Sequence, residues 1–394
     1  MRRDPERLQR ALEALDADSR RRQRRLISGY PVPGDRTRVL VDGRVLCNFS
    51  SNDYLGLARH PQLARALSEA AAEFGTGSGA AHLVSGHSAP HHRLEEELAA
   101  FTGRQRALLF STGYMANLGA VGALVGRGET VLQDRLNHAS LLDGARLCGA
   151  KLARYTHADA AAAAAQLAAH PRTSLLASDG LFSMDGDLAP VAKLAAIAAE
   201  QRAWLLIDDA HGLGTLGEHG GGTLELASLG AAEVPLLVGT LGKAFGCFGA
   251  FVAGDRDPIE YLLQHARSYI YTTALPPAVA AAASVALRLA REEGWRRVQL
   301  KQHIARFRAG AAALGIRLTG SESPIQPLIV GDAARVLSYA EALAAAGFWV
   351  GAIRPPTVPV GGSRLRITLS AAHRTDDIEA LLETLAALLR RSAA

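Results

Sequence analysis

The chain has 394 residues, of which 48% are hydrophobic and 39 are glycine, and its formal net charge is +5. This length exceeds what one hydrophobic core usually supports, so we expect at least two domains, and the composition is typical of an α/β enzyme. No apolar run approaches the roughly 20 residues of a membrane span. A net charge this small does not indicate a nucleic-acid partner, although it suits an anionic, phosphate-bearing substrate.

The three cysteines, Cys47, Cys148 and Cys247, are far apart in the sequence and form no C-x-x-C pair. They predict neither a disulfide framework nor a metal site, and a reducing cytoplasm is the expected compartment. Arginines near the N-terminus are interrupted by acidic residues, and no apolar segment with a cleavage site follows them. The pattern is therefore neither a secretion signal nor a transit peptide.

Residues 6–26 combine an apolar spacing with a run of positive charge. Leu8, Leu12 and Leu15 recur at helical intervals, and residues 20–25 include five arginines. The pattern predicts an amphipathic helix that ends in positive charge. Two interpretations of the arginine run stay open: a solvated helix face, or the mouth of a site that attracts an acidic substrate.

Short strands and helices alternate along most of the remaining chain. Residues 38–49 predict a hairpin around Asp42-Gly43, and helices are expected at 61–73 and 90–102. Strand-like apolar runs follow at 107–110, 130–133, 151–155, 174–177, 204–207, 236–238 and 250–253. Because apolar runs that are buried on both faces and joined by helices form parallel sheets, we expect an α/β fold with a mainly parallel, doubly wound sheet.

The composition changes after Pro276-Pro277, from where a long helix is predicted to run to about Arg291. The smaller α/β portion that follows has strand-like runs at 327–330 and 364–368 and helices near 335–346 and 375–390. We place the domain change near residue 289, since connecting elements often lie at such boundaries. The predicted parts are an N-terminal helix with a short β segment at 1–50, a large domain at 51–288 and a small C-terminal domain at 289–394.

A glycine-rich segment at 212–217 satisfies G-x-G-x-x-G and follows a predicted strand, which is typical of a dinucleotide fold. That fingerprint needs its glycines to open a helix, but here they lead into Glu218-His219 and three more glycines. We therefore reject it. Because no G-x-S-x-G, H-E-x-x-H or Walker motif is present, a serine hydrolase, a zinc peptidase and a P-loop enzyme also lose their main support.

Polar residues follow the predicted strands at their carboxyl ends, where open α/β sheets bind ligands. They are Gly113 and Tyr114 after the first strand, His138 after the second, Ser183 after the fourth, Asp208 and His211 after the fifth, and Thr240 and Lys243 after the sixth. A lysine among small residues is costly to bury unpaired, whereas a Schiff base needs a desolvated amine. We take Lys243 to be the covalent anchor of a cofactor.

Pyridoxal 5′-phosphate (PLP) chemistry requires such a set: a lysine for the Schiff base, an aspartate for the ring nitrogen, a phosphate cradle and a ring-stacking group. From about Arg22 to the last predicted helix, the chain resembles the α-oxoamine synthases, a family of fold-type I PLP enzymes. The motifs that carry the resemblance are N-F-S-S-N-D-Y-L-G at 48–56, D-R-L-N-H-A-S-L-L at 134–142, F-S-M-D-G-D at 182–187, D-D-A-H-G at 208–212, T-L-G-K at 240–243 and I-R-P-P-T-V-P at 353–359.

The resemblance implies a large PLP-binding domain, a smaller C-terminal domain and three catalytic residues. Lys243 would bind the cofactor covalently and move the α-proton of the substrate. Asp208 would pair with the ring nitrogen and keep it protonated, because an opposite charge favours the cationic form. His138 would stack on the ring and also contact the substrate. No metal is implied.

The remaining cofactor contacts are implied by the same resemblance. Gly113 and Tyr114 would give backbone N–H groups to the phosphate at a helix N-terminus, and Thr240 would add its hydroxyl. His211 would hydrogen-bond the phenolic oxygen of the ring, and Ser183 would complete the cofactor contacts.

The resemblance also implies substrate-binding residues. Arg366 is the candidate for the amino-acid carboxylate through a bidentate pair, assisted by Asn52. Thr357 lies at a position that contacts substrate in the family. The family's N-terminal arginine falls within the arginine run, where we choose Arg22 and hold Arg24 in reserve.

The implied activity is the decarboxylative condensation of L-alanine with a pimeloyl thioester, as in the branch of the family that serves biotin synthesis. The carrier of the thioester, coenzyme A or an acyl carrier protein, stays open. The segment 271–273 resembles one that reaches the phosphate of a partner subunit, which implies a homodimer with shared sites. Two alternatives remain: a sibling synthase that uses glycine or serine, and a catalytically inactive binding protein on the same fold. We assign no role to the loop at 75–79.

Overall fold

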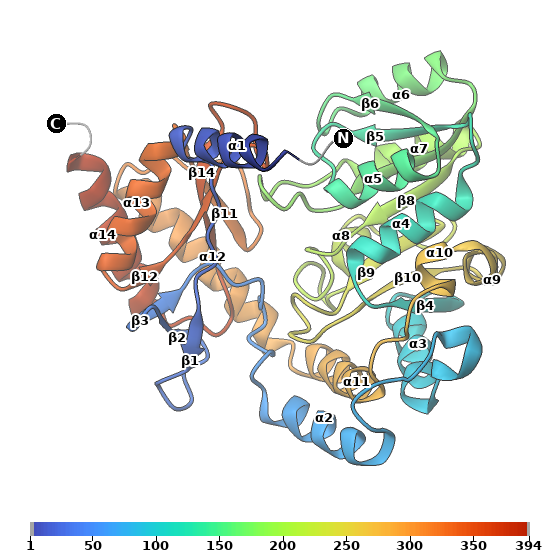
Figure 1. Ribbon diagram of the computed structural model, residues 1–394, viewed down its shortest axis with the longest axis horizontal. Coiled ribbons are helices and arrows are strands. Elements are labelled where there is room, and N and C mark those ends of the chain that lie inside the picture. Colours follow the sequence, from blue (N-terminus) through green and yellow to red (C-terminus); the bar gives the residue numbers. More distant parts are fainter. Residues whose placement is uncertain (1–3, 392–394) are drawn as a thin grey trace. The chain divides into compact units, whose positions relative to one another are not determined.

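The computed structural model describes residues 4–391, and the chain divides into two compact units (Figure 1). The large unit comprises Asn52–Ser183 and Asp187–Val298. The small unit comprises the described residues up to Ser51, the short segment Met184–Gly186, and the described residues from Gln299 onward. We describe each unit by itself.

A seven-stranded sheet forms the centre of the large unit, in the order β4-β10-β9-β8-β7-β5-β6. Its strands are β4 (Arg106–Phe110), β5 (Thr130–Asp134), β6 (Lys151–Tyr155), β7 (Thr173–Asp179), β8 (Trp204–Asp208), β9 (Leu236–Thr240) and β10 (Ala250–Gly254). Strand β10 runs antiparallel to both β4 and β9, whereas the pairs from β9 to β6 are parallel. The predicted strands and the mainly parallel α/β fold are confirmed.

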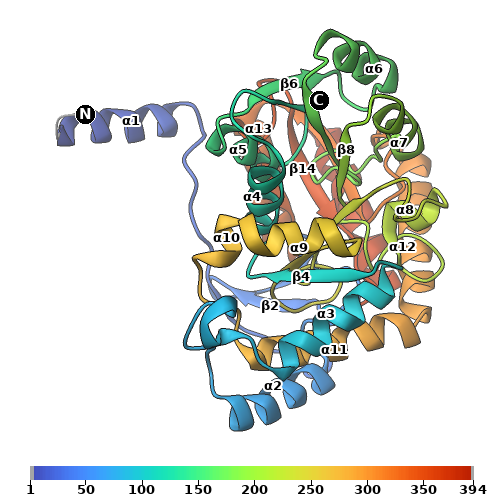
Figure 2. The ribbon, with the colours of Figure 1, turned by 90° about the vertical axis from the view of Figure 1, so that its right-hand side faces the viewer.

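Helices connect these strands and cover the sheet. They are α2 (Pro61–Phe74), the π-helix η1 (His82–Gly86), α3 (Ala89–Phe101), α4 (Gly113–Leu124), α5 (Ala139–Leu147), α6 (Ala160–Ala169), α7 (Val191–Glu200), α8 (Gly222–Leu226), α9 (Arg256–His265), α10 (Arg267–Ile270) and α11 (Pro277–Glu292). A core cluster joins buried side chains of α4, α5 and α9 to one face of the sheet, including Ala120, Leu141 and Ile259. Figure 2 shows α4 and α9 on that side.

The rejected dinucleotide fingerprint lies in turns, as expected. Residues 212–217 open no helix, and Gly214 and Gly217 have φ of +82° and +81°, which favours glycine. The next helix, α8, begins only at Gly222 and is five residues long. The segment therefore cannot present the helix N-terminus that a pyrophosphate requires.

The small unit contains two small sheets. One has the order β1-β2-β3-β12, with β1 (Ile27–Gly29), β2 (Arg38–Val41), β3 (Arg44–Asn48) and β12 (Phe348–Trp349). The other has the order β11-β14-β13, with β11 (Ile325–Gly331), β13 (Gly351–Ile353) and β14 (Ser363–Thr368). Its helices are α1 (Pro5–Ala17), α13 (Ala333–Ala345) and α14 (Thr375–Arg391), while α12 (Trp295–Ala313) begins in the large unit.

The predicted hairpin is confirmed. Strands β2 and β3 pair antiparallel, and the turn residues Asp42 and Gly43 have φ of +50° and +77°. Two consecutive positive φ values are the mark of a type I′ turn, which matches the twist of the flanking strands.

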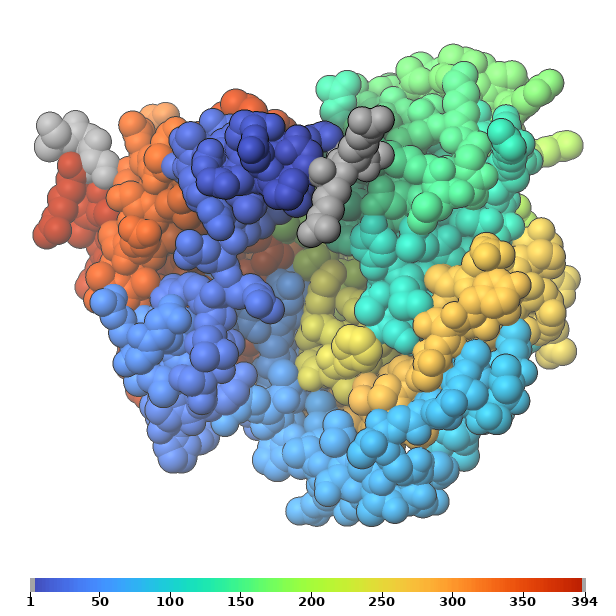
Figure 3. Space-filling view, in the orientation of Figure 1, coloured from blue at the N-terminus to red at the C-terminus, as the bar shows by residue number. Residues whose placement is uncertain are grey.

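The N-terminal helix is shorter than predicted. Helix α1 ends at Ala17, Ser19 has a φ of +55°, and the arginine run from Arg20 to Arg25 has no helical structure. The expectation of a helix through residue 26 is wrong, because a left-handed residue breaks the helical backbone before the run begins. Helix α1 has no buried residue, and Figure 3 shows it on the surface.

The division of the chain differs from the predicted domains, and the segment Met184–Gly186, expected in the large domain, belongs to the small unit. The N-terminal residues, expected at 1–50 as a separate part, belong to the small unit, because β3 pairs with β12 and the Thr368 N–H bonds the Phe49 carbonyl at 2.7 Å. The last change of unit falls between Val298 and Gln299, within the first turn of α12, instead of near residue 289.

Candidate active site

A pocket of about 190 Å³ lies in the large unit at the carboxyl ends of its parallel strands. The structure brings to its wall all eight residues that the sequence suggested for a cofactor: Gly113, Tyr114, His138, Ser183, Asp208, His211, Thr240 and Lys243. They follow strands β4, β5, β7, β8 and β9. Parallel strands end at the same edge of a sheet, so residues more than a hundred positions apart meet there.

Asp208 is the last residue of β8 and is buried in the pocket wall. Its carboxylate accepts a hydrogen bond from Asn117 Nδ2 at 2.6 Å and another from the backbone N–H of Ala210 at 3.0 Å. Asn117 also donates to Ser140 Oγ at 2.8 Å. These donors fix the orientation of the carboxylate.

His138 begins helix α5 as its N-cap residue. Its Nδ1 lies 2.6 Å from Ser140 Oγ, and its backbone N–H donates to the carboxylate of Asp179 at 3.2 Å. Desolvation by the surrounding protein lowers the pKa of the His138 imidazole, an effect that the nearby Asp208 carboxylate partly offsets. A neutral ring fixed on one side by Ser140 is suited to lie flat against an aromatic ligand.

Asp179, at the end of β7, lies fully inside the protein beside Asp208. Burial and the charge of Asp208 together hold the pKa of the Asp179 carboxyl well above its usual range. Its backbone N–H donates to Asn137 Oδ1 at 3.0 Å, and Asn137 Nδ2 donates to the Ala177 carbonyl at 2.8 Å. These bonds lock the end of β7 to the loop that carries His138.

His211 faces the pocket from the loop after β8. Its Nδ1 lies 2.6 Å from the hydroxyl of Tyr54, a fully buried residue, and that hydroxyl also donates to Asn52 Oδ1 at 3.2 Å. Asn52, a predicted substrate residue, is therefore joined to the pocket wall through Tyr54. The chain of bonds sets the direction of the His211 ring.

Lys243 lies half-buried in the turn after β9. The turn is closed by the Gly246 N–H bonding the Lys243 carbonyl at 2.8 Å, and by the Cys247 N–H bonding the Leu241 carbonyl at 2.8 Å. Gly246 has a φ of +61°, and a Cβ there would lie 2.2 Å from the backbone nitrogen of Ala58. Only glycine fits, so the small residues around Lys243 serve its close packing.

The N-terminus of α4 provides a site for an anion. Gly113 and Tyr114 are its first two residues and line the pocket, while the side chain of the N-cap Thr112 accepts from the Met115 N–H. A Cβ placed on Gly113 would meet nothing within 4 Å, which shows open space beside this backbone. Backbone N–H groups and the helix dipole favour a phosphate there. Thr240, whose hydroxyl donates to the Gly249 carbonyl at 3.1 Å, lines the same pocket.

Three predicted substrate residues belong to the small unit and are described with it. Arg22 Nη2 donates to Thr357 Oγ1 at 2.9 Å, so these two residues meet although 335 positions separate them. Arg354, three residues before Thr357, donates to the carbonyl of Arg21 at 3.0 Å. Arg366 is buried in β14 and donates to Thr368 Oγ1 at 3.2 Å.

Sequence reasoning missed three residues of this site: Asn117, Asp179 and Tyr54. Asn117 lies four positions after Gly113 in an otherwise apolar helix, and a polar residue on the buried face of such a helix is a usable signal. Asp179 lies two positions after the predicted strand and is the last residue of β7, at the same edge of the sheet as the other candidates. Tyr54 lies inside a quoted motif, but only the fold reveals its bond to His211.

The residues present fit the cofactor that the sequence suggests. A lysine, a buried carboxylate held by two donors, a neutral histidine and a helix N-terminus line one small pocket. PLP requires a Schiff-base amine, a partner for its ring nitrogen, a stacking group and a phosphate site, and each requirement has a residue here.

Comparisons with known proteins agree with this chemistry. The family described as "Aminotransferase class I and II" matches residues 44–385. An 8-amino-7-oxononanoate synthase of Methylococcus capsulatus is 60% identical over 377 residues, which cover 95% of this chain and 96% of that protein. The synthase of the same name from Cellvibrio japonicus is 56% identical over 97% of this chain and 96% of its own length.

Solved structures give the same answer for the fold. A serine palmitoyltransferase from S. paucimobilis, solved with bound PLP, superposes with a TM-score of 0.92 at 29% identity over 99% of this chain and all of its own. An 8-amino-7-oxononanoate synthase from Francisella tularensis superposes with a TM-score of 0.77 at 30% identity, over 89% of this chain and 99% of its own. The chain therefore belongs to the aminotransferase class I and II family and, within it, to the 8-amino-7-oxononanoate synthases, which are PLP-dependent acyltransferases.

Proposed function

We propose that the pocket of the large unit is the active site and that Lys243, Asp208 and His138 are its catalytic residues. The reaction is that of the family: decarboxylative condensation of L-alanine with a pimeloyl thioester, which gives 8-amino-7-oxononanoate for biotin synthesis. One observation carries the proposal, namely that a single pocket gathers a lysine, an aspartate and two histidines from successive strands.

Lys243 performs the central proton transfer. When bound, PLP supplies an electron-poor ring that stabilises negative charge on the α-carbon of the amino acid. The Lys243 amine, which lines the pocket, would hold the cofactor covalently and would serve as the base for the α-proton of alanine. The α-carbon then bonds to the acyl carbon, the thiol carrier leaves, and the alanine carboxylate departs as carbon dioxide. Lys243 finally returns a proton to the α-carbon.

Asp208 would keep the nitrogen of a bound cofactor ring protonated. Its carboxylate, held by Asn117 and the Ala210 N–H, places a fixed negative charge at the base of the pocket. An opposite charge at hydrogen-bond distance raises the affinity of a pyridine nitrogen for its proton. Asn117 therefore acts as a positioning residue for Asp208.

The other pocket residues bind and orient the cofactor. We assign the N-terminus of α4, at Gly113 and Tyr114, to the phosphate together with the Thr240 hydroxyl. His138 would stack on the ring and contact the substrate. His211, whose Nδ1 is held by the Tyr54 hydroxyl, would hydrogen-bond the phenolic oxygen of the ring.

Ser183 also lines the pocket, and we assign its hydroxyl to the remaining contact with the cofactor.

Arginines bind the two carboxylates of the substrates. We assign Arg366, with Asn52, to the alanine carboxylate, because a guanidinium binds a carboxylate through two parallel hydrogen bonds. We assign Arg22 and Thr357 to the acyl substrate, and their mutual hydrogen bond supports treating them as one contact. A pimeloyl chain ends in a carboxylate and its carrier is phosphate-bearing, so both suit positive charge.

A turnover assay separates the candidate substrates. Purified holoenzyme is supplied with L-alanine, glycine or L-serine, each with pimeloyl coenzyme A and with the pimeloyl acyl carrier protein. The proposal requires that alanine gives product with at least one carrier and that glycine and serine give much less. If glycine or serine is the preferred amino acid, the chain is a sibling synthase; if no amino acid reacts and no cofactor binds, it is a binding protein on this fold.

We infer a homodimer with shared sites, supported by the segment Tyr271-Thr272-Thr273, in which Tyr271 is 70% exposed. In a mixture of Lys243→Ala and Thr272→Ala subunits, refolded together, activity should exceed that of either variant alone.

We place the enzyme in the cytoplasm, supported by three free cysteines. No described helix has the length and apolar character needed to cross a membrane.

A further inference from the structure

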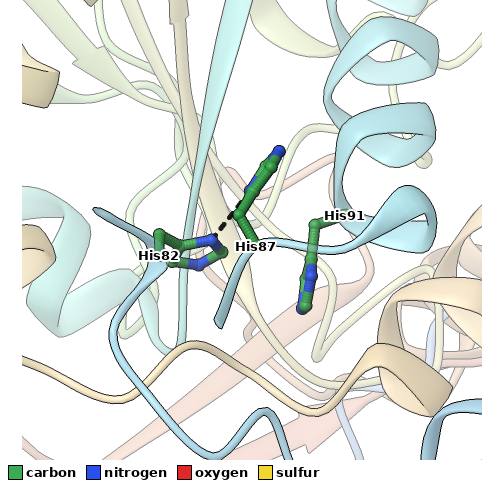
Figure 4. A group of neighbouring side chains, drawn as sticks. All are labelled: His82, His87 and His91. Atoms are coloured by element: carbon green, nitrogen blue, oxygen red, sulfur yellow. Dashed lines mark hydrogen bonds between the residues drawn. The ribbon is translucent and has the colours of Figure 1, made fainter. Parts of the chain in front are cut away.

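Histidines gather in the large unit at the junction of η1 and α3, outside the pocket described above. His82 begins η1, His87 directly follows it, and His91 and His92 lie in the first turn of α3. His82 and His87 share a hydrogen bond between their Nδ1 atoms at 3.0 Å, and Figure 4 shows these two rings with His91 beside them. His82 also stacks on Tyr269, with ring centroids 4.9 Å apart.

His91 has a structural role in this cluster. Its Nδ1 accepts from the Ser88 backbone N–H at 3.1 Å, which completes a capping box at the start of α3. Its Nε2 donates to the Leu275 carbonyl at 2.6 Å. Both ring nitrogens are therefore engaged by the fold, so His91 is not a candidate ligand.

His87, His92 and Glu95 form a different set, in which ligand atoms from all three lie within 4.8 Å of one another. His92 and Glu95 are three positions apart on α3 and therefore share a face of the helix. His87 approaches that face from the residue before the N-cap. The Leu109 N–H donates to Glu95 Oε1 at 2.9 Å and so orients the carboxylate.

These three side chains line a pocket of about 250 Å³, together with His82. This volume accommodates a hydrated metal ion. Two charged groups lie nearby: Glu96, whose carboxylate is 3.4 Å from His92 Nε2 in an exposed contact, and Arg106, which is paired with Glu260. The pairing of Arg106 limits its repulsion of a cation.

We propose that His87, His92 and Glu95 bind a divalent late first-row transition-metal ion, for which Zn²⁺ is the fitting representative. Two imidazoles and one carboxylate are a common ligand set for zinc, and water completes the tetrahedron. His82 acts as the outer partner, because its bond to His87 Nδ1 fixes the orientation of that ring and leaves Nε2 to the ion.

A bound ion would tie the end of η1 to the first turns of α3. The segment next to this junction is linked to residues 274–275, since the Ala274 N–H bonds the Ala80 carbonyl at 3.0 Å and Ser78 Oγ bonds the Leu275 carbonyl at 2.6 Å. Metal binding should therefore stabilise the folded protein, because a ligand that binds only the folded state raises its unfolding temperature.

Calorimetric titration of the chelator-washed holoenzyme with ZnCl₂ tests the site. We expect saturable binding of one ion per chain, a raised Tm, and a Co²⁺ derivative with visible absorption. His87→Ala and His92→Ala should each weaken binding by at least tenfold, and His82→Phe, which keeps the stack on Tyr269, by about 10–100-fold. His265→Ala is the matched control, because His265 is exposed on α9 and should leave the affinity unchanged.

Glu95→Gln provides a further variant that keeps the shape of the side chain, and cofactor absorbance confirms that each variant is folded. The absence of saturable Zn²⁺ binding to the wild-type holoenzyme would overturn the proposal. So would an affinity that is unchanged in both His87→Ala and His92→Ala. Equal weakening by His265→Ala would show that the ions bind surface histidines without a defined site.

Discussion

Single residues in this pocket derive their chemistry from their neighbours. Asp208 and Asp179 end neighbouring strands and are paired in register. Two donors hold Asp208, whereas burial and the charge of Asp208 raise the pKa of Asp179. Both side chains line the pocket, and the Asp179 carboxyl accepts the hydrogen bond from the His138 N–H.

Asp208→Asn should therefore remove the charge while keeping the shape of the side chain. We expect the variant to bind PLP but to lose exchange of the alanine α-proton, because the ring nitrogen would no longer hold its proton. Exchange is measured by proton NMR of alanine in D₂O with and without the thioester. An unchanged exchange rate would show that Asp208 is not the partner of the ring nitrogen.

Arg22→Ala tests the assignment of the acyl substrate. The variant loses its bond to Thr357 and, if Arg22 binds the thioester, about 1.5–3 kcal/mol of transition-state stabilisation in kcat/KM for that substrate. Alanine binding, followed by the absorbance of the bound cofactor, should barely change. Arg24→Ala is the matched control; if Arg24→Ala impairs thioester kinetics and Arg22→Ala does not, the assignment within the arginine run is wrong by two positions.

At the scale of elements, the sequence predicted most of the sheet because its strands are apolar runs buried on both faces. The carboxyl ends of β8 and β9 could be located for the same reason, and this placed Asp208 and Lys243. The helix predicted to continue through the arginine run is wrong, because a single left-handed residue, Ser19, follows the end of α1 before the run begins. Such a local break leaves no trace in hydrophobic spacing.

His157 links two elements of the large unit and gives a pH prediction. Its Nδ1 lies 2.9 Å from Asp134 Oδ1, at the end of β5, and its Nε2 lies 2.8 Å from Asp187 Oδ2. Burial acts to lower the pKa of His157, but the two carboxylates outweigh it and raise the pKa to about 10.

Because the folded-state pKa is higher than the ordinary value of 6.5, the protonated ring stabilises the fold fully below about pH 6.5, and this contribution is lost as the pH rises to about 10. His157→Gln should therefore lower the Tm most at pH 6, with the difference from wild type shrinking toward pH 10. Thermal unfolding of wild type and His157→Gln between pH 6 and pH 10 measures this difference in Tm. A difference that stays constant with pH would mean that His157 is not charged in the folded protein.

At the scale of the whole molecule, the sequence could not show which segments fold together. Strand β3 pairs with β12 across about three hundred residues, so the N-terminal residues join the C-terminal ones in one unit. Arg22 meets Thr357 for the same reason. Hydrophobic periodicity reports local structure, whereas such pairings depend on contacts between distant segments.

The family model matches residues 44–385 of the chain. The central claim about the mechanism concerns Lys243. The most direct measurement is alanine-dependent product formation by Lys243→Ala, beside wild type, with both thioesters and with product detected by mass spectrometry. The variant should remain folded, as judged by its circular dichroism, and should lose turnover, because the residue supplies both the covalent anchor and the base. Turnover near the wild-type rate in a folded Lys243→Ala protein would contradict the account.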